Sequence, residues 1–243
     1  MPWVAGIDGC RSGWIVVLVE YDAGHLCNHH VTLCPTFADV LGLDPKPKVI
    51  AIDIPIGLLD KPEPGGRECD RQARKLLGRR ASSIFSPPTR LMLEATHYEQ
   101  VRTQGLSIQS FNILPKIREV DRLMTLELQK RIHEAHPELA FMSLAGAPMT
   151  HNKKTQEGRE ERLLALQQWL GPIPLPAALS LKGRGKNGVT TPQRFSRSQV
   201  ASDDILDAYV LAWTALHILN GQASHVLSNP PIDEKGLRME ICY

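Results

Sequence analysis

The chain has 243 residues, of which 42% are hydrophobic and 22% are charged, so it has enough apolar surface for a substantial core and is not a disordered chain. Its 28 basic and 26 acidic side chains give a net charge of +2, so any preference for nucleic acid must come from local patches. The sequence contains no run of about 20 apolar residues, which excludes a membrane-spanning segment.

The cysteines and the first residues indicate the compartment. The five cysteines are odd in number and none belongs to a C-x-x-C pair, so we expect reduced thiols rather than a disulfide framework or a zinc site. The segment MPWVAGIDGC lacks a basic leader with a long apolar stretch, so we expect no signal peptide. These features predict a cytoplasmic protein.

Apolar runs at the start of the chain predict strands. Residues 3–10, 13–21 and 25–35 are joined by short turns, which favour antiparallel hairpins. The amphipathic segment 36–43 predicts a helix capped by Thr36. Residues 49–57 (VIAIDIPIG) are almost continuously apolar, which predicts a strand buried on both faces and parallel to a neighbour.

From residue 60 to residue 130 the pattern is helical and interrupted by proline and glycine. A helix is predicted before Gly78, and another over 116–128 with Pro115 in its first turn. The remaining predicted elements are a short strand at 131–136, a helix at 157–170, a basic loop at 171–202, a helix at 203–219 and an edge strand at 238–243.

The order of these elements predicts one α/β domain over residues 1–243. An antiparallel meander followed by right-handed parallel crossovers gives a mixed five-stranded sheet flanked by helices. Residues 60–130 are expected to form a helical insertion, and the last residues to add a C-terminal strand.

Carboxylates at unusual places indicate a site. Asp8 ends the first predicted strand, and Asp53 lies within the buried fourth strand, where a charge is costly unless it is paired, hydrogen-bonded or bound to a metal. Asp204 and Asp207 lie three residues apart at the start of the last helix and share one face. These residues form the predicted acidic cluster: Asp8, Asp53, Asp204 and Asp207.

Each acid also has an ordinary structural interpretation. Asp53 precedes Pro55 and fits a turn, and the acids of the SDD segment suit a helix N-terminus. Glu134 ends the short strand RIHEAH, where it is either a ligand or water-orienting group or an exposed acid. Together, clustered acids suit two divalent ions about 4 Å apart, which activate water for an in-line phosphodiester displacement.

Basic residues near these acids are candidates for phosphate contacts. Arg11 borders the first hairpin beside Asp8, although a turn arginine is an equally simple interpretation. The loop 171–202 is rich in Lys, Arg, Gly and Pro and leads directly to the acidic helix, as expected of a phosphate-gripping loop. The residues expected to bind substrate are Arg11, Arg67, Lys153, Lys154 and Arg159.

Several segments carry a family resemblance: GIDGCRSGW, IDIPIGL, RECDRQAR, GLSIQ, KIREVD, HEAHPE, KKTQEGR and DDILDA. In this order they resemble domain-of-unknown-function family 429, a family predicted to consist of nucleases with the ribonuclease-H fold. More distantly the chain is similar to Holliday-junction resolvases, in which Asp-x-x-Asp-Ala opens the last helix, as Asp204, Asp207 and Ala208 do here. The resemblance implies Mg²⁺ or Mn²⁺ as cofactor; Glu134 has no firm counterpart in the resolvases.

The leading hypothesis is a metal-dependent nuclease acting on DNA or RNA. Its catalytic residues would be the acidic cluster together with Glu134. One alternative is a non-catalytic nucleic-acid-binding domain. Another is an ATP phosphotransferase of the actin and sugar-kinase type, which also carries an Asp-Gly hairpin, but the chain shows no second such hairpin. The sequence leaves monomer and homodimer open.

Overall fold

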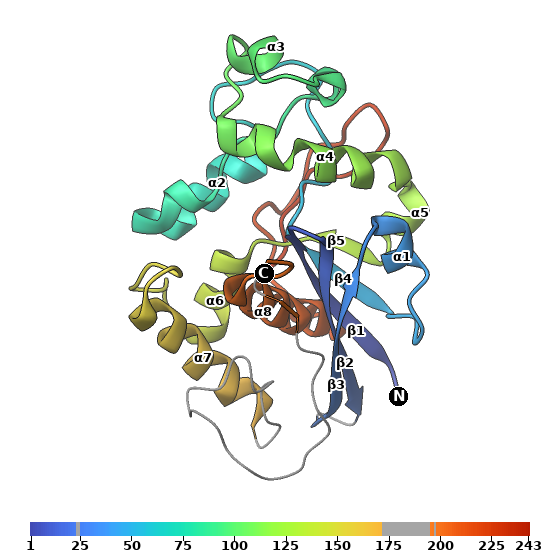
Figure 1. Ribbon diagram of the computed structural model, residues 1–243, viewed down its shortest axis with the longest axis vertical. Coiled ribbons are helices and arrows are strands. Elements are labelled where there is room, and N and C mark those ends of the chain that lie inside the picture. The colour runs from blue at the N-terminus through green and yellow to red at the C-terminus, as the bar shows by residue number, and fades with distance from the viewer. Residues whose placement is uncertain (23–24, 172–194, 197) are drawn as a thin grey trace.

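The fold is built on one five-stranded sheet with the order β3-β2-β1-β4-β5 (Figure 1). The computed structural model describes residues 1–22, 25–171, 195–196 and 198–243. The strands are β1 (Trp3–Cys10), β2 (Gly13–Asp22), β3 (His25–Cys34), β4 (Val49–Ile52) and β5 (Ile132–Glu134). Within this sheet β2 pairs antiparallel with β1 and β3, whereas β4 pairs parallel with β1 and β5.

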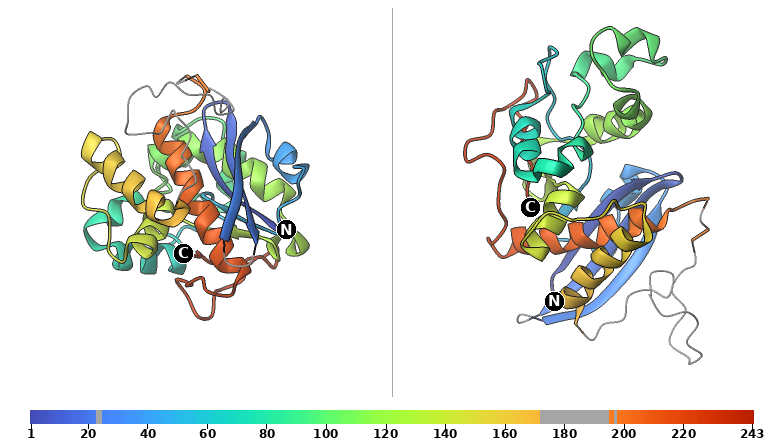
Figure 2. Two further views of the ribbon diagram at one scale, coloured as in Figure 1. Left: turned by 90° about the horizontal axis from the view of Figure 1, so that it is seen from below. Right: turned by 90° about the vertical axis from the view of Figure 1, so that its left-hand side faces the viewer.

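Helices cover both faces of the sheet (Figure 2). On one face α8 (Ser202–Leu219) packs against β1, β2 and β4, and α6 (Pro137–Ala145) and α7 (Gln156–Leu170) pack against α8. On the other face α1 (Phe37–Leu41) and α4 (Ile108–Leu123) contribute side chains to a second core around Trp14. Because β2 alternates between these two cores, Val17 joins the first and Val16 the second.

This strand order, with the second strand reversed and helices on both faces, is that of the ribonuclease-H fold. The predicted fold class is therefore confirmed. The hairpins predicted at the start of the chain are also confirmed, because Cys10 pairs with Gly13 across a two-residue turn. No helix among the described residues is long and apolar enough to cross a membrane.

The fourth strand is shorter than predicted. It ends at Ile52, and the Asp53 backbone N–H donates to the carbonyl of Ile7 as the chain leaves the sheet. Pro55 has no N–H to extend a ladder, so the apolar residues up to 57 are buried in a loop. Asp53 therefore lies just beyond the strand end rather than within the strand.

The segment between β4 and β5 consists of short helices. They are α2 (Glu68–Leu77), the 3-10 helices η1 (Gly78–Ser83) and η2 (Arg90–Glu94), α3 (Glu99–Arg102), α4 and α5 (Leu126–Gln129). The helix predicted over 116–128 is wrong in its bounds: α4 begins at Ile108 behind the cap Ser107, and Pro115 lies in its interior. Pro115 is exposed, so water can bond the carbonyl that lacks a helical donor.

Two further differences concern the later part of the chain. The sequence interpretation missed α6, in which Pro137 occupies the first turn instead of merely ending β5. The predicted terminal strand at 238–243 is reduced to isolated bridges, among them Ala135 with Cys242 and His225 with Cys242. The predicted loop at 171–202 lies mostly outside the described residues.

Candidate acidic active site

Asp8 and Asp53 lie side by side because their strands are parallel neighbours. Ile7 pairs with Ile52, so the next residue on each strand reaches the same edge of the sheet. Asp8 is only 8% exposed, and its Oδ1 accepts from the Gly9 backbone N–H at 2.7 Å. The carboxylates of Asp8 and Asp53 thus lie directly after the last residue pair of the apolar β1–β4 ladder.

The helix α8 brings the other two aspartates to this edge. Asp204 lies in its first turn, where its Oδ2 accepts from the Ala201 backbone N–H at 3.0 Å, and Asp207 follows one turn later, 1% exposed. The helix can approach β1 closely because of Gly6: a Cβ there would lie 2.0 Å from the Ala208 carbonyl oxygen. A glycine on β1 therefore sets the distance between Asp8 and Asp207.

The members of the acidic cluster perturb one another. Burial raises the pKa of Asp8 well above its ordinary value, and the charges of Asp53, Asp207 and Asp204 raise it further. Burial raises the pKa of Asp207 to about 6, with Lys153 opposing the shift. Burial also raises the pKa of Asp53 and of Asp204. Full ionisation of the cluster is therefore costly unless a cation offsets its negative charge.

Lys153 supplies a cation to this cluster. Its Nζ lies 2.6 Å from Asp207 Oδ2. Burial lowers the pKa of Lys153, but the attraction of Asp207, Asp8 and Asp53 outweighs burial, so the pKa is raised. Lys153, expected to contact substrate, thus contacts an aspartate of the cluster.

The cluster fits divalent ions in its chemistry but not as a closed shell around one ion. All its donors are carboxylate oxygens, which Mg²⁺ and Mn²⁺ prefer. Among the described residues, no three of these aspartates bring ligand oxygens within 4.8 Å of one another. One ion with bonds of about 2.1 Å needs closer oxygens, whereas two ions about 4 Å apart span a wider set.

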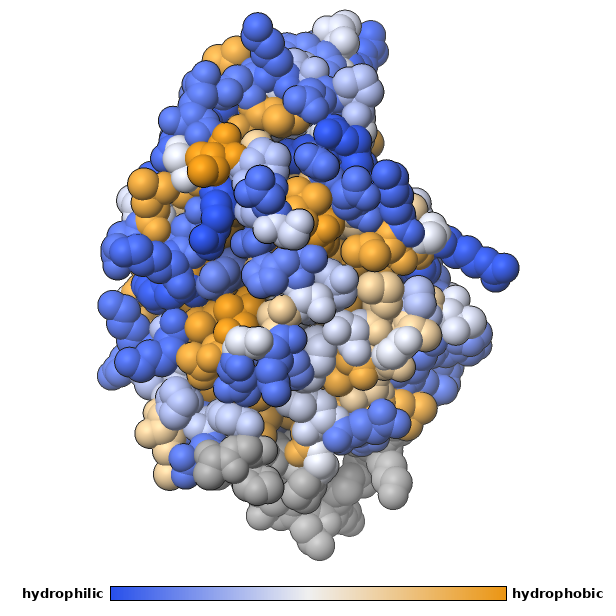
Figure 3. Space-filling model, turned by 180° about the vertical axis from the view of Figure 1, so that it is seen from behind, coloured by the Kyte–Doolittle hydropathy of each residue, from blue (hydrophilic) through white to orange (hydrophobic). Residues whose placement is uncertain are grey.

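A cleft of about 630 Å³ opens next to the cluster. Asp8 and Asp53 line it together with Lys153, whereas Asp204 and Asp207 are not among its described lining residues. On the face of the molecule seen from behind, hydrophobic side chains lie in separate patches between hydrophilic ones (Figure 3). The cleft itself is lined by charged side chains such as Asp8 and Lys153 together with apolar ones such as Ile54 and Phe85.

Arg67 and Glu134 are placed differently from the sequence expectation. Arg67 is 1% exposed, and its guanidinium donates to Asp70, to Glu134 and to the carbonyls of Ile56 and Gly57. With each nitrogen already bonded, Arg67 has no free donor for a phosphate, so its assignment as substrate-binding is corrected.

Glu134 is the partner of this arginine. Its Oε2 also accepts from the Ile56 backbone N–H at 2.7 Å. Burial raises the pKa of Glu134, although Arg67 stabilises its charged form. Glu134 lines the cleft, yet in this conformation its carboxylate holds Arg67 and the loop after β4 in place.

The other expected basic residues lie at varied positions. Lys154 is exposed and lines the cleft, whereas Arg11 is exposed in the turn between β1 and β2. Arg159 is half-buried on α7. Neither Arg11 nor Arg159 lines the described part of the cleft.

Two cleft residues were missed from the sequence. Lys116 on α4 donates to the Gly13 carbonyl at 2.5 Å, lies over the Trp14 ring and faces Asp8. His136, the cap of α6, lies close enough to Asp53 to oppose the rise in its pKa. The KIREVD and HEAHPE segments were noticed, but nothing local to them indicates a neighbour that lies about 80 residues or more away.

Together, fold and site define a ribonuclease-H-like α/β protein with an acidic cluster where β1, β4 and α8 meet. A family model described as "Protein of unknown function (DUF429)" matches residues 6–232, and the chain belongs to this family, as its motifs predicted. The comparison with curated proteins found no match. A solved structure titled "Thermus thermophilus RuvC structure" is 14% identical; the match covers 90% of this chain and 97% of that chain, with a TM-score of 0.38.

Proposed function

We propose that this protein is a metal-dependent phosphodiester hydrolase, a nuclease acting on DNA or RNA. The observation that carries the proposal is the convergence of the acidic cluster from β1, the end of β4 and the start of α8 into one site, with Asp8 and Asp207 buried and Asp53 and Asp204 half-buried. Buried carboxylates that raise one another's pKa are costly for folding, and such costs are concentrated at functional sites.

The acidic cluster would hold Mg²⁺ or Mn²⁺, with Asp8 and Asp53 on the side that is open to the cleft. Bound divalent ions would activate a water molecule and stabilise the leaving oxygen of the phosphodiester. Asp207 and Asp204 would complete the ligand set, their positions fixed by α8.

The substrate would enter through the cleft, where basic side chains surround the acids. Lys116, Lys154 and Arg80 line it, and their charges suit a phosphate backbone. Asn112 and Gln109 on α4 add polar groups to the same wall. These residues would orient the phosphodiester over Asp8 and Asp53.

The proposal is tested by incubating the purified protein with duplex DNA, single-stranded DNA, branched DNA and RNA in Mg²⁺ or Mn²⁺. We expect cleavage of at least one substrate, abolished by EDTA. In Asp8→Asn the rate should fall at least about 100-fold, equivalent to about 3 kcal/mol of transition-state stabilisation.

The matched control is Asp22→Asn, which removes an exposed carboxylate at the far end of β2 and should leave the rate unchanged. Equal cleavage by wild type and Asp8→Asn would contradict the site assignment. ATP hydrolysis without cleavage of nucleic acid would favour the phosphotransferase alternative.

One observation favours a second candidate, a nucleic-acid-binding domain without catalysis. The ion pair between Lys153 and Asp207 partly neutralises the acidic cluster without a metal. This candidate predicts nucleic-acid binding that is independent of divalent ions and no cleavage in either metal.

A further inference from the structure

A second group of metal-ligating side chains lies away from the acidic cluster. His133 comes from β5, and Glu240 and Cys242 come from the C-terminal segment 238–243 beside it. A bridge between Ala135 and Cys242 holds the segment parallel to β5, and Cys242 donates its backbone N–H to the Glu134 carbonyl at 2.9 Å.

Side-chain alternation separates this group from the cleft. Since Ala135 pairs with Cys242 in parallel register, His133 lies opposite Glu240 on the same face. The intervening residues Glu134 and Ile241 line the cleft, whereas none of His133, Glu240 and Cys242 is among its described lining residues. The group is therefore independent of the proposed nuclease site.

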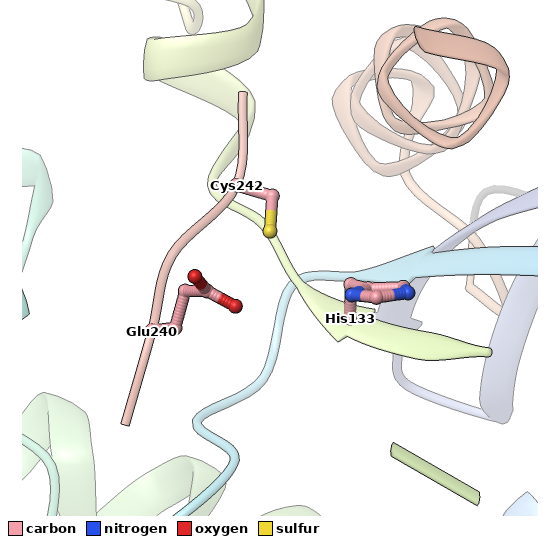
Figure 4. Close-up of side chains that lie close together, drawn as sticks. All are labelled: His133, Glu240 and Cys242. Atoms are coloured by element: carbon pink, nitrogen blue, oxygen red, sulfur yellow. The ribbon is translucent and has the colours of Figure 1, made fainter. Parts of the chain in front are cut away.

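The geometry of the group is close to that of a metal shell. One ligand atom from each of His133, Glu240 and Cys242 lies within 4.8 Å of the other two, and the Cys242 sulfur and the Glu240 carboxylate point towards β5 (Figure 4). His225 Nδ1 lies 3.6 Å from Cys242 Sγ and 2.9 Å from Glu240 Oε1. Ligand atoms of a tetrahedral zinc ion, with bonds of 2.0 to 2.3 Å, are about 3.5 Å apart.

We infer that His133, Glu240 and Cys242 form a zinc site, with His225 as the fourth ligand. A thiolate, imidazoles and a carboxylate are the donor types of zinc, whereas Mg²⁺ avoids sulfur and nitrogen. Binding releases the Cys242 thiol proton to solvent. The ion would connect segment 238–243 and the loop that carries His225 to β5, next to the end of β5 at Glu134. The expectation of no zinc site rested on the absence of C-x-x-C spacing, whereas the inferred ligands lie 92 or more positions from His133.

Cobalt tests this site because a thiolate bound to Co²⁺ gives a charge-transfer absorption that carboxylates cannot give. We expect the tag-free, metal-free, full-length protein to develop this band at one Co²⁺ per chain, and one Zn²⁺ to abolish it while Mg²⁺ does not. Cys242→Ser should lose the band. The matched control Cys27→Ser, which changes a thiol on β3 at the other edge of the sheet, should keep it.

A second variant covers the case in which Cys242→Ser does not fold. Glu240→Gln keeps the thiolate band, and in competition with a chromophoric chelator its zinc affinity should fall at least about 10-fold. Absence of the band in wild type, or unchanged zinc affinity in Glu240→Gln, would overturn the proposal. Since neither readout involves nuclease activity, failure here leaves the proposed function untouched, and the reverse also holds.

Discussion

Lys153 decides how the acidic cluster is neutralised when no metal is bound. Its ammonium touches Asp207 and is attracted by Asp8 and Asp53, so a divalent ion would have to displace it or bind against its charge. Lys154, the next residue, is exposed and lines the same cleft. The two lysines therefore provide a matched pair for testing the cluster.

We expect Lys153→Gln to bind Mg²⁺ about 10-fold more tightly than wild type, because the competing positive charge is gone. Isothermal titration with Mg²⁺ at about pH 8, where the carboxylates are ionised, measures this effect. Equal Mg²⁺ affinities for Lys153→Gln and Lys154→Gln would contradict this role.

At the scale of elements, the approach of α8 to β1 positions the site. Gly6 leaves no room for a side chain: the nearest atoms to a Cβ are the Ala208 carbonyl oxygen at 2.0 Å and the Ala212 nitrogen at 2.1 Å. Both are backbone atoms of α8, so the helix cannot relieve the clash by a rotamer change. Any side chain at Gly6 must push α8, and Asp207 with it, away from Asp8.

We expect Gly6→Ala to lower the free energy of unfolding by about 1–3 kcal/mol and to weaken Mg²⁺ binding. The control is Gly42→Ala at the end of α1, where the nearest atom to a Cβ is 3.6 Å away and φ is −90°, so the change should stay within about 0.5 kcal/mol. Urea unfolding measures both variants. Equal stabilities would show that α8 does not depend on this glycine.

The elements also show what local sequence can predict. The strands of the meander could be predicted from their apolar runs, because a buried strand has alternating or continuous apolar residues. The start of α4 could not be predicted in this way. Pro115 suggested the first turn of a helix, whereas the cap Ser107 lies two turns earlier. An exposed proline within a helix is tolerated, and exposure is not visible in a single sequence.

At the scale of the whole molecule, the sequence interpretation placed the aspartates in one neighbourhood because their positions at the first strand's end, on the fourth strand and at the last helix's start resemble those in the Holliday-junction resolvases. It did not foresee the ion pair of Arg67 with Glu134, which joins residues 67 positions apart. It likewise did not foresee that Lys153 would contact Asp207, 54 positions away. Tertiary packing determines which distant residues form such pairs, and neither composition nor periodicity contains that information.

The charge of the cluster makes stability depend on pH and metal. Burial raises the pKa of Asp207 from 3.8 to about 6. The folded protein then holds this proton more tightly than the unfolded chain, so the group's contribution to stability is complete below about pH 4 and is lost as the pH rises through about 6. A divalent ion binds the ionised form and should restore stability above that range.

We therefore expect Mg²⁺ at about 100 times its Kd to raise the Tm by about 5 to 10 °C at about pH 7.5, and by much less at about pH 5. Mg²⁺ is the ion of choice because it does not compete for the cysteine and imidazole donors of the inferred zinc site. Thermal unfolding followed by circular dichroism measures the shift. In Asp207→Asn the shift at the higher pH should disappear; an equal shift at both pH values would contradict the role of Asp207.

The most direct test is the anomalous difference density of crystals grown with Mn²⁺. We expect two manganese peaks about 4 Å apart, with carboxylate oxygens of Asp8, Asp53, Asp204 and Asp207 shared between them at about 2.2 Å, and the Lys153 ammonium displaced from Asp207. The contradictory result would be an unbroken contact between Lys153 and Asp207 with no manganese density beside the four aspartates.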